Sequence, residues 1–147
     1  MKITHWSDFN CPNSYIGLVR LKKAADELDL DFEWIMKPFE LYPTLFNTPT
    51  SSIVTQNVLK YGLTPEETEE RIIETEKIAL KDGIELNYRN VQLTSSRNAH
   101  RLVQYVQNRH PDISLELIFK IFEANFCENR IIADITTLVE ISAELGL

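Results

Sequence analysis

The pattern of apolar and polar positions divides the chain into a short strand–helix–strand region and a longer helical region. Residues 2–7 are rich in β-branched and aromatic side chains, and residues 31–37 alternate between apolar and charged ones. Between them, apolar residues recur at helical spacing over residues 12–29. This order predicts a βαβ unit with parallel strands. We expect the tryptophans of the two strands, Trp6 and Trp34, to lie in the core.

The remainder of the chain has the pattern of an all-helical segment. A proline-rich connector over residues 38–50 precedes it, and residues 84–93 are expected to be an extended connector without a partner strand. Thr64, Pro65 and Glu67 have the spacing of a capping box with proline at the first helical position. The expected helices span residues 51–61, 65–82, 94–109, 115–128 and 135–145, the fourth capped by Asp112 or Ser114 and the last by Asp134.

Composition narrows the class of protein. The chain has 147 residues, of which 44% are hydrophobic and 25% charged, which is typical of one globular domain. A net charge of −7 argues against a nucleic-acid or anionic-membrane surface. The N-terminus has no apolar segment typical of a secretory signal. We therefore expect a soluble, cytoplasmic protein whose two cysteines, Cys11 and Cys127, are thiols at rest.

Cys11 lies where the first strand gives way to the first helix. Pro12 suits the first position of a helix, so Cys11 is expected to be the N-cap. Its sulfur would then face the unpaired N–H groups of the first turn and the positive end of the helix dipole. Both favour the thiolate, which is the nucleophilic form. Open α/β sheets also place their functional sites at the carboxyl ends of their strands.

Several segments resemble the DsbA-like thioredoxin superfamily, in particular its FrnE-like cytoplasmic branch. Residues 8–17, DFNCPNSYIG, resemble the active-site pattern of an acidic-aromatic pair followed by Cys-Pro-x-Cys-Tyr-Ile-Gly. Residues 38–43, 94–102 and 138–147 resemble later signatures of the family. The resemblance implies an α/β fold, mostly helical by residue count, in which a thioredoxin-like βαβ portion (1–43) carries an all-helical insertion (44–147). The C-terminal ββα half of the thioredoxin fold is expected to be absent from this chain.

Ser14 stands where the family pattern has its second, resolving cysteine. The resemblance implies a thiol–disulfide oxidoreductase in which Cys11 is the nucleophile, with Pro12 and Ser14 beside it in the catalytic motif. Such a monothiol site forms a mixed disulfide and cannot resolve it locally. Cys127 is either a distant resolving thiol or, as we favour, a small buried hydrophobe.

Five further residues are candidates for a supporting role. His5 either stabilises a thiolate or is an ordinary residue on a sheet face, and Asp8 either accepts a proton or caps the loop that follows. In the family-like signature His100 faces the cleft, although packing beside the insertion is the simpler expectation. The full set of supporting candidates is His5, Asp8, Asn13, Tyr15 and His100. His5, Cys11, His100 and Cys127 do not have metal-ligand spacing, so no metal site is expected.

Two other functions stay open. Kappa-class glutathione transferases and 2-hydroxychromene-2-carboxylate isomerases are similar in sequence pattern but carry Ser-Pro-x-Ser, and they hold a glutathione thiolate at the helix N-terminus. The motif Cys-Pro-Asn-Ser at residues 11–14 lies between the two patterns, so glutathione is a possible co-substrate, and no other cofactor is expected. The third hypothesis is a non-catalytic helical interaction module with a structural cysteine.

The expected partners follow from these functions and from the fold. They are thiol- or disulfide-containing proteins or glutathione, with no nucleic acid and no membrane. In the complete family fold the first strand is central, so here one of its edges is expected to lack a partner. Either the chain is part of a longer protein or a homodimer covers this edge.

Overall fold

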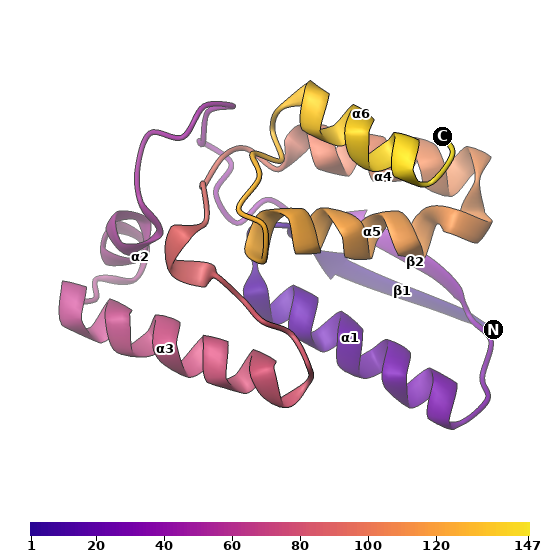
Figure 1. Cartoon of the computed structure of the whole chain (residues 1–147), viewed down its shortest axis with the longest axis horizontal. Helices are drawn as coiled ribbons and strands as arrows, with labels where there is room; N and C mark the ends of the chain where they lie inside the picture. Colours follow the sequence, from indigo (N-terminus) through magenta and orange to yellow (C-terminus); the bar gives the residue numbers. More distant parts are fainter.

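A two-stranded parallel sheet and its crossover helix begin the chain. The computed structural model describes all residues, Met1–Leu147. Strand β1 (Lys2–Ser7) pairs with β2 (Glu33–Pro38) in register from Lys2 opposite Glu33 to Ser7 opposite Pro38, and α1 (Pro12–Glu27) connects them (Figure 1). The prediction of a parallel βαβ unit is therefore confirmed.

Helices form most of the structure. In Figure 1, α4, α5 and α6 stack on one side of the turn that follows β1, and α2 and α3 lie on the other side. The elements after β2 are α2 (Ile53–Tyr61), α3 (Pro65–Lys81), a short 3-10 helix η1 (Tyr88–Asn90), α4 (Arg97–Arg109), α5 (Pro111–Phe126) and α6 (Ile135–Glu144). None of the helices is both long enough and apolar enough to cross a membrane.

Local start and stop signals are visible at three helices, and those at α3 and α6 are the ones that the sequence predicts. Thr64 and Glu67 form a complete capping box at the start of α3. Asp134 caps α6 by accepting a hydrogen bond from the Thr136 N–H. Gly62 ends α2 in the left-handed conformation, with φ of 67°, which glycine adopts without a Cβ penalty.

Helix α5 begins earlier than expected. It starts at Pro111, and His110 is both the C-cap of α4 and the N-cap of α5, whereas a start after Asp112 or Ser114 was expected. The reason is that proline is well suited to the first helical position, where its missing N–H has no intrahelical partner to lose. The two helices therefore follow each other with almost no connection and pack side by side (Figure 1).

The placement of Trp6 differs from the prediction. Its side chain is 69% exposed, whereas Trp34 packs partly buried against the core. Strand β1 pairs only with β2, so its other edge has no neighbouring strand to cover Trp6. The core lies instead among the helices, and every helix contributes buried apolar side chains to it. Phe9 joins it from the turn after β1, with its ring centroid 4.8 Å from that of Phe122 and 5.1 Å from that of His100.

The outer edge of β2 is closed by side chains of α4. Gln107 accepts a hydrogen bond from the Met36 N–H at 2.6 Å, and Gln104 donates to the Met36 carbonyl at 2.8 Å. Pro38 ends the strand without an N–H group. An unpaired strand edge invites association with other chains, so these contacts protect β2.

Candidate functional site

Cys11 is the N-cap of α1, as the sequence predicts. Its backbone is extended, with φ of −106° and ψ of 109°, and Pro12 takes the first helical position. The Cys11 N–H donates to the Asp8 carbonyl at 3.0 Å, which closes the turn between β1 and α1. The residue lies directly beyond the carboxyl end of β1, where parallel sheets place their sites.

The Cys11 side chain differs from the expectation in one respect, because it makes no capping hydrogen bond. The Ser14 N–H, a donor of the first turn, donates to the carbonyl of Cys11 itself at 3.1 Å. Pro12 supplies no N–H at all. The sulfur therefore stays free of the helix backbone, and Cys11 is half-buried.

Asp8 anchors the turn that carries Cys11. Its side chain is 1% exposed; Oδ2 accepts from the Leu41 N–H at 2.6 Å, and Oδ1 accepts from the Asn10 N–H at 3.3 Å. Nε2 of His100, from α4, lies 3.3 Å from Oδ1 and 3.2 Å from the Phe39 carbonyl. Both neighbours are acceptors, so Nε2 carries the proton. The structure thus places the side chains of Asp8 and His100 in the protein interior, where their contacts hold the turn in position.

Two amide side chains hold the same turn from elements far along the chain. Asn10 donates to the Thr94 carbonyl at 2.8 Å, just before α4 begins. Asn125, from α5, donates to the Phe9 carbonyl at 2.8 Å. Both asparagines are buried, so these bonds form away from competing water. The position of the cysteine is therefore fixed by α4 and α5 as well as by α1.

Cys11 lies between two hollows. The first, of about 330 Å³, is open along the free side of β1 and brings His5, Asn13 and Ser14 together with Cys11. The second, of about 60 Å³, lies toward α2 and α3, and Asn10, Cys11, Pro12 and Asn13 line its near wall. The far wall of this small cavity is made by Leu41, Tyr42, Asn57, Tyr61, Thr68, Arg71, Ile72, Thr75 and Tyr88.

His5 is part of the open hollow and is held by the strand. Its Nδ1 lies 2.8 Å from Ser7 Oγ, and its Nε2 is buried without a hydrogen-bond partner. Burial lowers the pKa of His5 below its usual value of 6.5, because desolvation disfavours the imidazolium. His5 is consequently neutral at neutral pH, and it contributes no positive charge there to stabilise a thiolate.

Tyr15 and Cys127 face another part of the molecule. The Tyr15 ring is buried and stacks on Phe122 at a centroid distance of 5.2 Å, and Tyr15 and Cys127 line a separate hollow. Burial, followed by the charge of Glu123, raises the pKa of the Cys127 thiol. Cys127 lines neither hollow that contains Cys11. Tyr15 therefore belongs to the core, and Cys127 is a weak nucleophile.

The far wall of the small cavity was not foreseen from the sequence. Its tyrosines, Thr68 and Arg71 come from the connector after β2, from α2 and α3, and from η1. In sequence they are ordinary positions of helices and connectors, with no motif that links them to Cys11. The packing of α3 beside α1 brings them together. Groups of three or more possible metal ligands do not occur in the structure.

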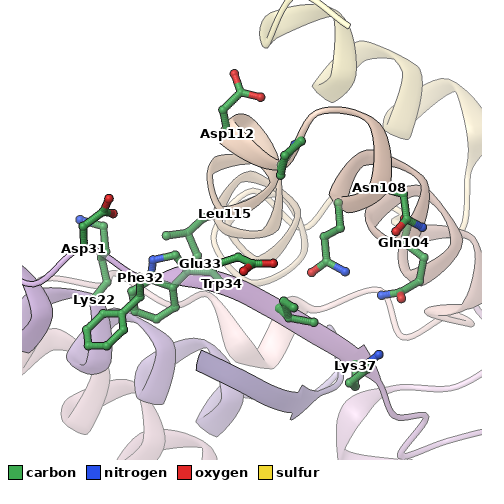
Figure 2. A pocket seen from close by; sticks show the side chains of 13 residues that line it. Lys22, Asp31, Phe32, Glu33, Trp34, Lys37, Gln104, Asn108, Asp112 and Leu115 are labelled. Carbon is green, nitrogen blue, oxygen red and sulfur yellow. The ribbon is translucent and has the colours of Figure 1, made fainter. Parts of the chain in front are cut away.

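A larger hollow, of about 460 Å³, lies on the outer side of β2 and is separate from Cys11 (Figure 2). Lys37 and Trp34 project into it from β2, and Gln104 and Asn108 approach from α4. It contains none of the predicted site residues, and both of its glutamines, Gln104 and Gln107, are already hydrogen-bonded to Met36.

Almost the whole chain matches the model of one protein family. The model of the DSBA-like thioredoxin domain matches residues 2–147. This chain belongs to the DSBA-like thioredoxin domain family. The thioredoxin-like fold predicted from the sequence is thereby confirmed, and the βαβ unit with its helical segment is its structural form here.

The chain is also similar to individual proteins. The chain is 26% identical over 153 residues to the uncharacterized protein YwbO of Bacillus subtilis strain 168 and covers 64% of it. The crystal structure of a probable DsbA oxidoreductase from Streptomyces coelicolor superposes with a TM-score of 0.84 at 26% identity, over 100% of this chain and 63% of that one. A 2-hydroxychromene-2-carboxylate isomerase shares the fold, with a TM-score of 0.61 at 17% identity, over 99% of this chain and 66% of that one. The DSBA-like chain thus spans less than two thirds of the first two relatives.

Proposed function

We propose that this chain carries out thiol–disulfide exchange with Cys11 as its single nucleophilic thiol. The observation that carries the proposal is the position of Cys11: it is the N-cap of α1, its sulfur is free of backbone hydrogen bonds, and it lies between two hollows. A helix N-terminus favours the thiolate over the thiol. Membership of the DSBA-like family and the likeness to a probable DsbA oxidoreductase support the same kind of chemistry.

The reaction proceeds in two exchanges. The Cys11 thiolate attacks one sulfur of a substrate disulfide, a new S–S bond joins the two molecules, and the other substrate sulfur leaves as a thiolate. Ser14 cannot attack this mixed disulfide, because it has no thiol. A second thiol, from glutathione or from a protein, therefore attacks it and regenerates the Cys11 thiolate. We propose the cytoplasm as the compartment, where such thiols are abundant.

The rate of alkylation by iodoacetamide tests whether Cys11 is activated. In a Cys127→Ala background Cys11 is the only thiol, and the Cys11→Ala variant reports Cys127 alone. We expect Cys11 to reach half of its plateau rate at a lower pH than free glutathione measured alongside, and at a much lower pH than Cys127. If the pH at which Cys11 reaches half of its plateau rate equals or exceeds that of glutathione, the proposal is contradicted and a non-catalytic interaction module is favoured.

A second candidate function is glutathione chemistry without disulfide exchange. The observation in its favour is that Ser14 and Cys11 line the same open hollow, where the Ser14 hydroxyl could accept or donate a hydrogen bond to a bound sulfur. Binding of reduced glutathione to the Cys11→Ala variant in the Cys127→Ala background tests it, since the protein then has no thiol with which glutathione could form a disulfide. Calorimetric binding that is lost in Cys11→Ala/Ser14→Ala would support a glutathione site; no binding would reject it.

We also propose that two copies of this chain associate through the free edge of β1. Trp6 is 69% exposed on this edge, and β1 has no second partner strand. Sedimentation velocity should then show a dimer that the Trp6→Lys variant disrupts. A monomeric wild-type chain at the highest soluble concentration would contradict this proposal.

A further inference from the structure

The small cavity behind Cys11 has room for very few atoms. Its volume is about 60 Å³, and Cys11 forms part of its wall. For comparison, an engineered apolar cavity of about 150 Å³ binds benzene. The cavity therefore has room for a molecule of a few heavy atoms beside the sulfur. Any ligand that it takes beside the sulfur is small.

Two residues of its wall each carry a buried polar atom that has no partner within the chain. The two atoms are Oγ1 of Thr68, whose residue is fully buried, and Oδ1 of Asn10, whose residue is 2% exposed. Buried polar atoms in folded proteins are almost always hydrogen-bonded, because leaving them unpaired is costly. Thr68 and Asn10 come from different elements, α3 and the turn after β1, and both line the same cavity. The two atoms indicate a polar occupant.

Several polar groups in the wall, the tyrosine phenols and the Arg71 guanidinium, are hydrogen-bond donors. Burial raises the pKa of Tyr88 to about 12 and also raises that of Tyr42, so both phenols keep their protons. Arg71 lies over the ring of Tyr61, 5.0 Å from its centroid, and forms no ion pair with a carboxylate. The cavity is lined by no Asp or Glu. These groups favour negative charge on an oxygen that lies beside the sulfur.

We propose that this cavity admits hydrogen peroxide and that Cys11 is oxidised there to a sulfenic acid. The inference rests on the proposed function, because it uses the same Cys11 thiolate. The thiolate attacks one oxygen of the peroxide, the S–O bond forms and the O–O bond breaks. Sulfur loses two electrons to the peroxide, and the departing hydroxide takes a proton from solvent to become water. Thr68 and Asn10 bind the peroxide oxygens, and Arg71 stabilises the charge that moves to the departing oxygen.

Because Ser14 has no thiol, the sulfenic acid at Cys11 has no neighbouring cysteine in its motif. A sulfenic acid next to a second cysteine condenses with it to a disulfide. Here the sulfenic acid instead awaits a thiol from another molecule, whose sulfur displaces water and forms the mixed disulfide. Oxidation by peroxide would thus lead to the same kind of mixed disulfide as the exchange reaction.

The test compares two reagents that consume the same thiolate. Both rates are measured in the Cys127→Ala background. The first is the rate at which hydrogen peroxide oxidises Cys11, with the sulfenic acid trapped by dimedone and detected by intact mass. It is divided by the rate at which iodoacetamide alkylates Cys11. This ratio cancels any change in the thiolate fraction. We expect Thr68→Val to lower the ratio by about tenfold, the effect of one lost hydrogen bond of ordinary strength. Thr137→Val is the matched control, because Thr137 is a buried helical threonine that lines neither hollow.

A second variant keeps the test decisive if Thr68→Val folds poorly. Arg71 is exposed, so Arg71→Gln should fold, and it should also lower the ratio while Arg71→Lys restores part of it. An unchanged ratio in both cavity variants would mean that the cavity holds only water and would overturn the inference. Failure of the proposed function is recognised separately, by Cys11 alkylation no faster than that of glutathione, whatever the ratio.

Discussion

Nε2 of His100 lies 3.3 Å from Oδ1 of Asp8, although 92 residues separate the two along the chain. Both side chains are almost completely buried, at 5% and 1% exposed. The contact joins α4 to the turn that carries Cys11. The geometry around the cysteine therefore depends on a helix that follows the βαβ unit. A substitution of Asp8 would weaken this contact and disturb the turn.

Asp8→Asn should destabilise the protein strongly. Asp8 accepts hydrogen bonds from the Leu41 and Asn10 N–H groups as well as from His100. In either orientation the amide NH₂ of asparagine would face a donor, so at least one buried donor loses its acceptor. We expect the free energy of unfolding to fall by about 2 kcal/mol or more in urea denaturation.

The exposed Asp31 provides the control for this change. It accepts no hydrogen bond from the rest of the chain, so Asp31→Asn should alter the stability by less than about 0.5 kcal/mol. Equal effects of the two substitutions would show that Asp8 is not a buried anchor of the turn.

His5 should make stability depend on pH in the weakly acidic range. Burial lowers its pKa in the folded state below 6.5, so the unfolded chain binds the proton at a higher pH than the folded one. This contribution to stability is fully present above about pH 6.5 and is lost as the pH falls through the lowered pKa. His5→Gln should therefore reduce the loss of stability between about pH 7.5 and about pH 5.5.

Urea unfolding midpoints at the two pH values measure this effect. The control is His110→Gln, because His110 is exposed at the junction of α4 and α5. If the His5→Gln variant shows the same pH dependence of stability as the wild type, other groups cause that dependence.

Gln107→Ala should open the outer edge of β2. Gln107 accepts from the Met36 N–H and donates to the Met36 carbonyl, and it lies beside the hollow of Figure 2. Without it, one N–H of the strand edge is unpaired, so we expect the free energy of unfolding to fall by about 1 kcal/mol. We also expect more aggregation on mild heating, which light scattering measures. Asn108→Ala is the neighbouring control, since the Asn108 side chain bonds only within α4. Similar aggregation of both variants would refute an edge-protecting role.

Ser14→Cys should convert the site to a dithiol. The Ser14 side chain and Cys11 line the same hollow one turn apart at the start of α1, which is the spacing of a Cys-x-x-Cys pair. After mild oxidation in the Cys127→Ala background, thiol titration should find no free thiol, whereas the unsubstituted Ser14 protein keeps one. Reductase activity toward a protein disulfide should then rise above that of the monothiol chain. If both thiols of the variant stay free, the two side chains do not meet as the hollow suggests.

The sequence by itself determined the local features of this protein. Strand alternation and helical spacing gave the βαβ order, and Thr64, Glu67 and Asp134 gave helix starts, because capping involves only neighbours along the chain. Cys11 as N-cap followed from Pro12 for the same reason. The family could also be recognised, because its motif is a contiguous run of residues.

Only the tertiary structure decided what surrounds the cysteine. The anchoring of its turn by His100 and Asn125, the cavity that Thr68 and Arg71 complete, and the exposure of Trp6 all depend on how α3, α4 and α5 pack around the sheet. Those contacts join residues tens of positions apart, and no periodicity or short motif encodes them. The sequence thus placed the sulfur at the start of a helix, whereas packing alone set the burial, charge and hydrogen-bond donors that it meets.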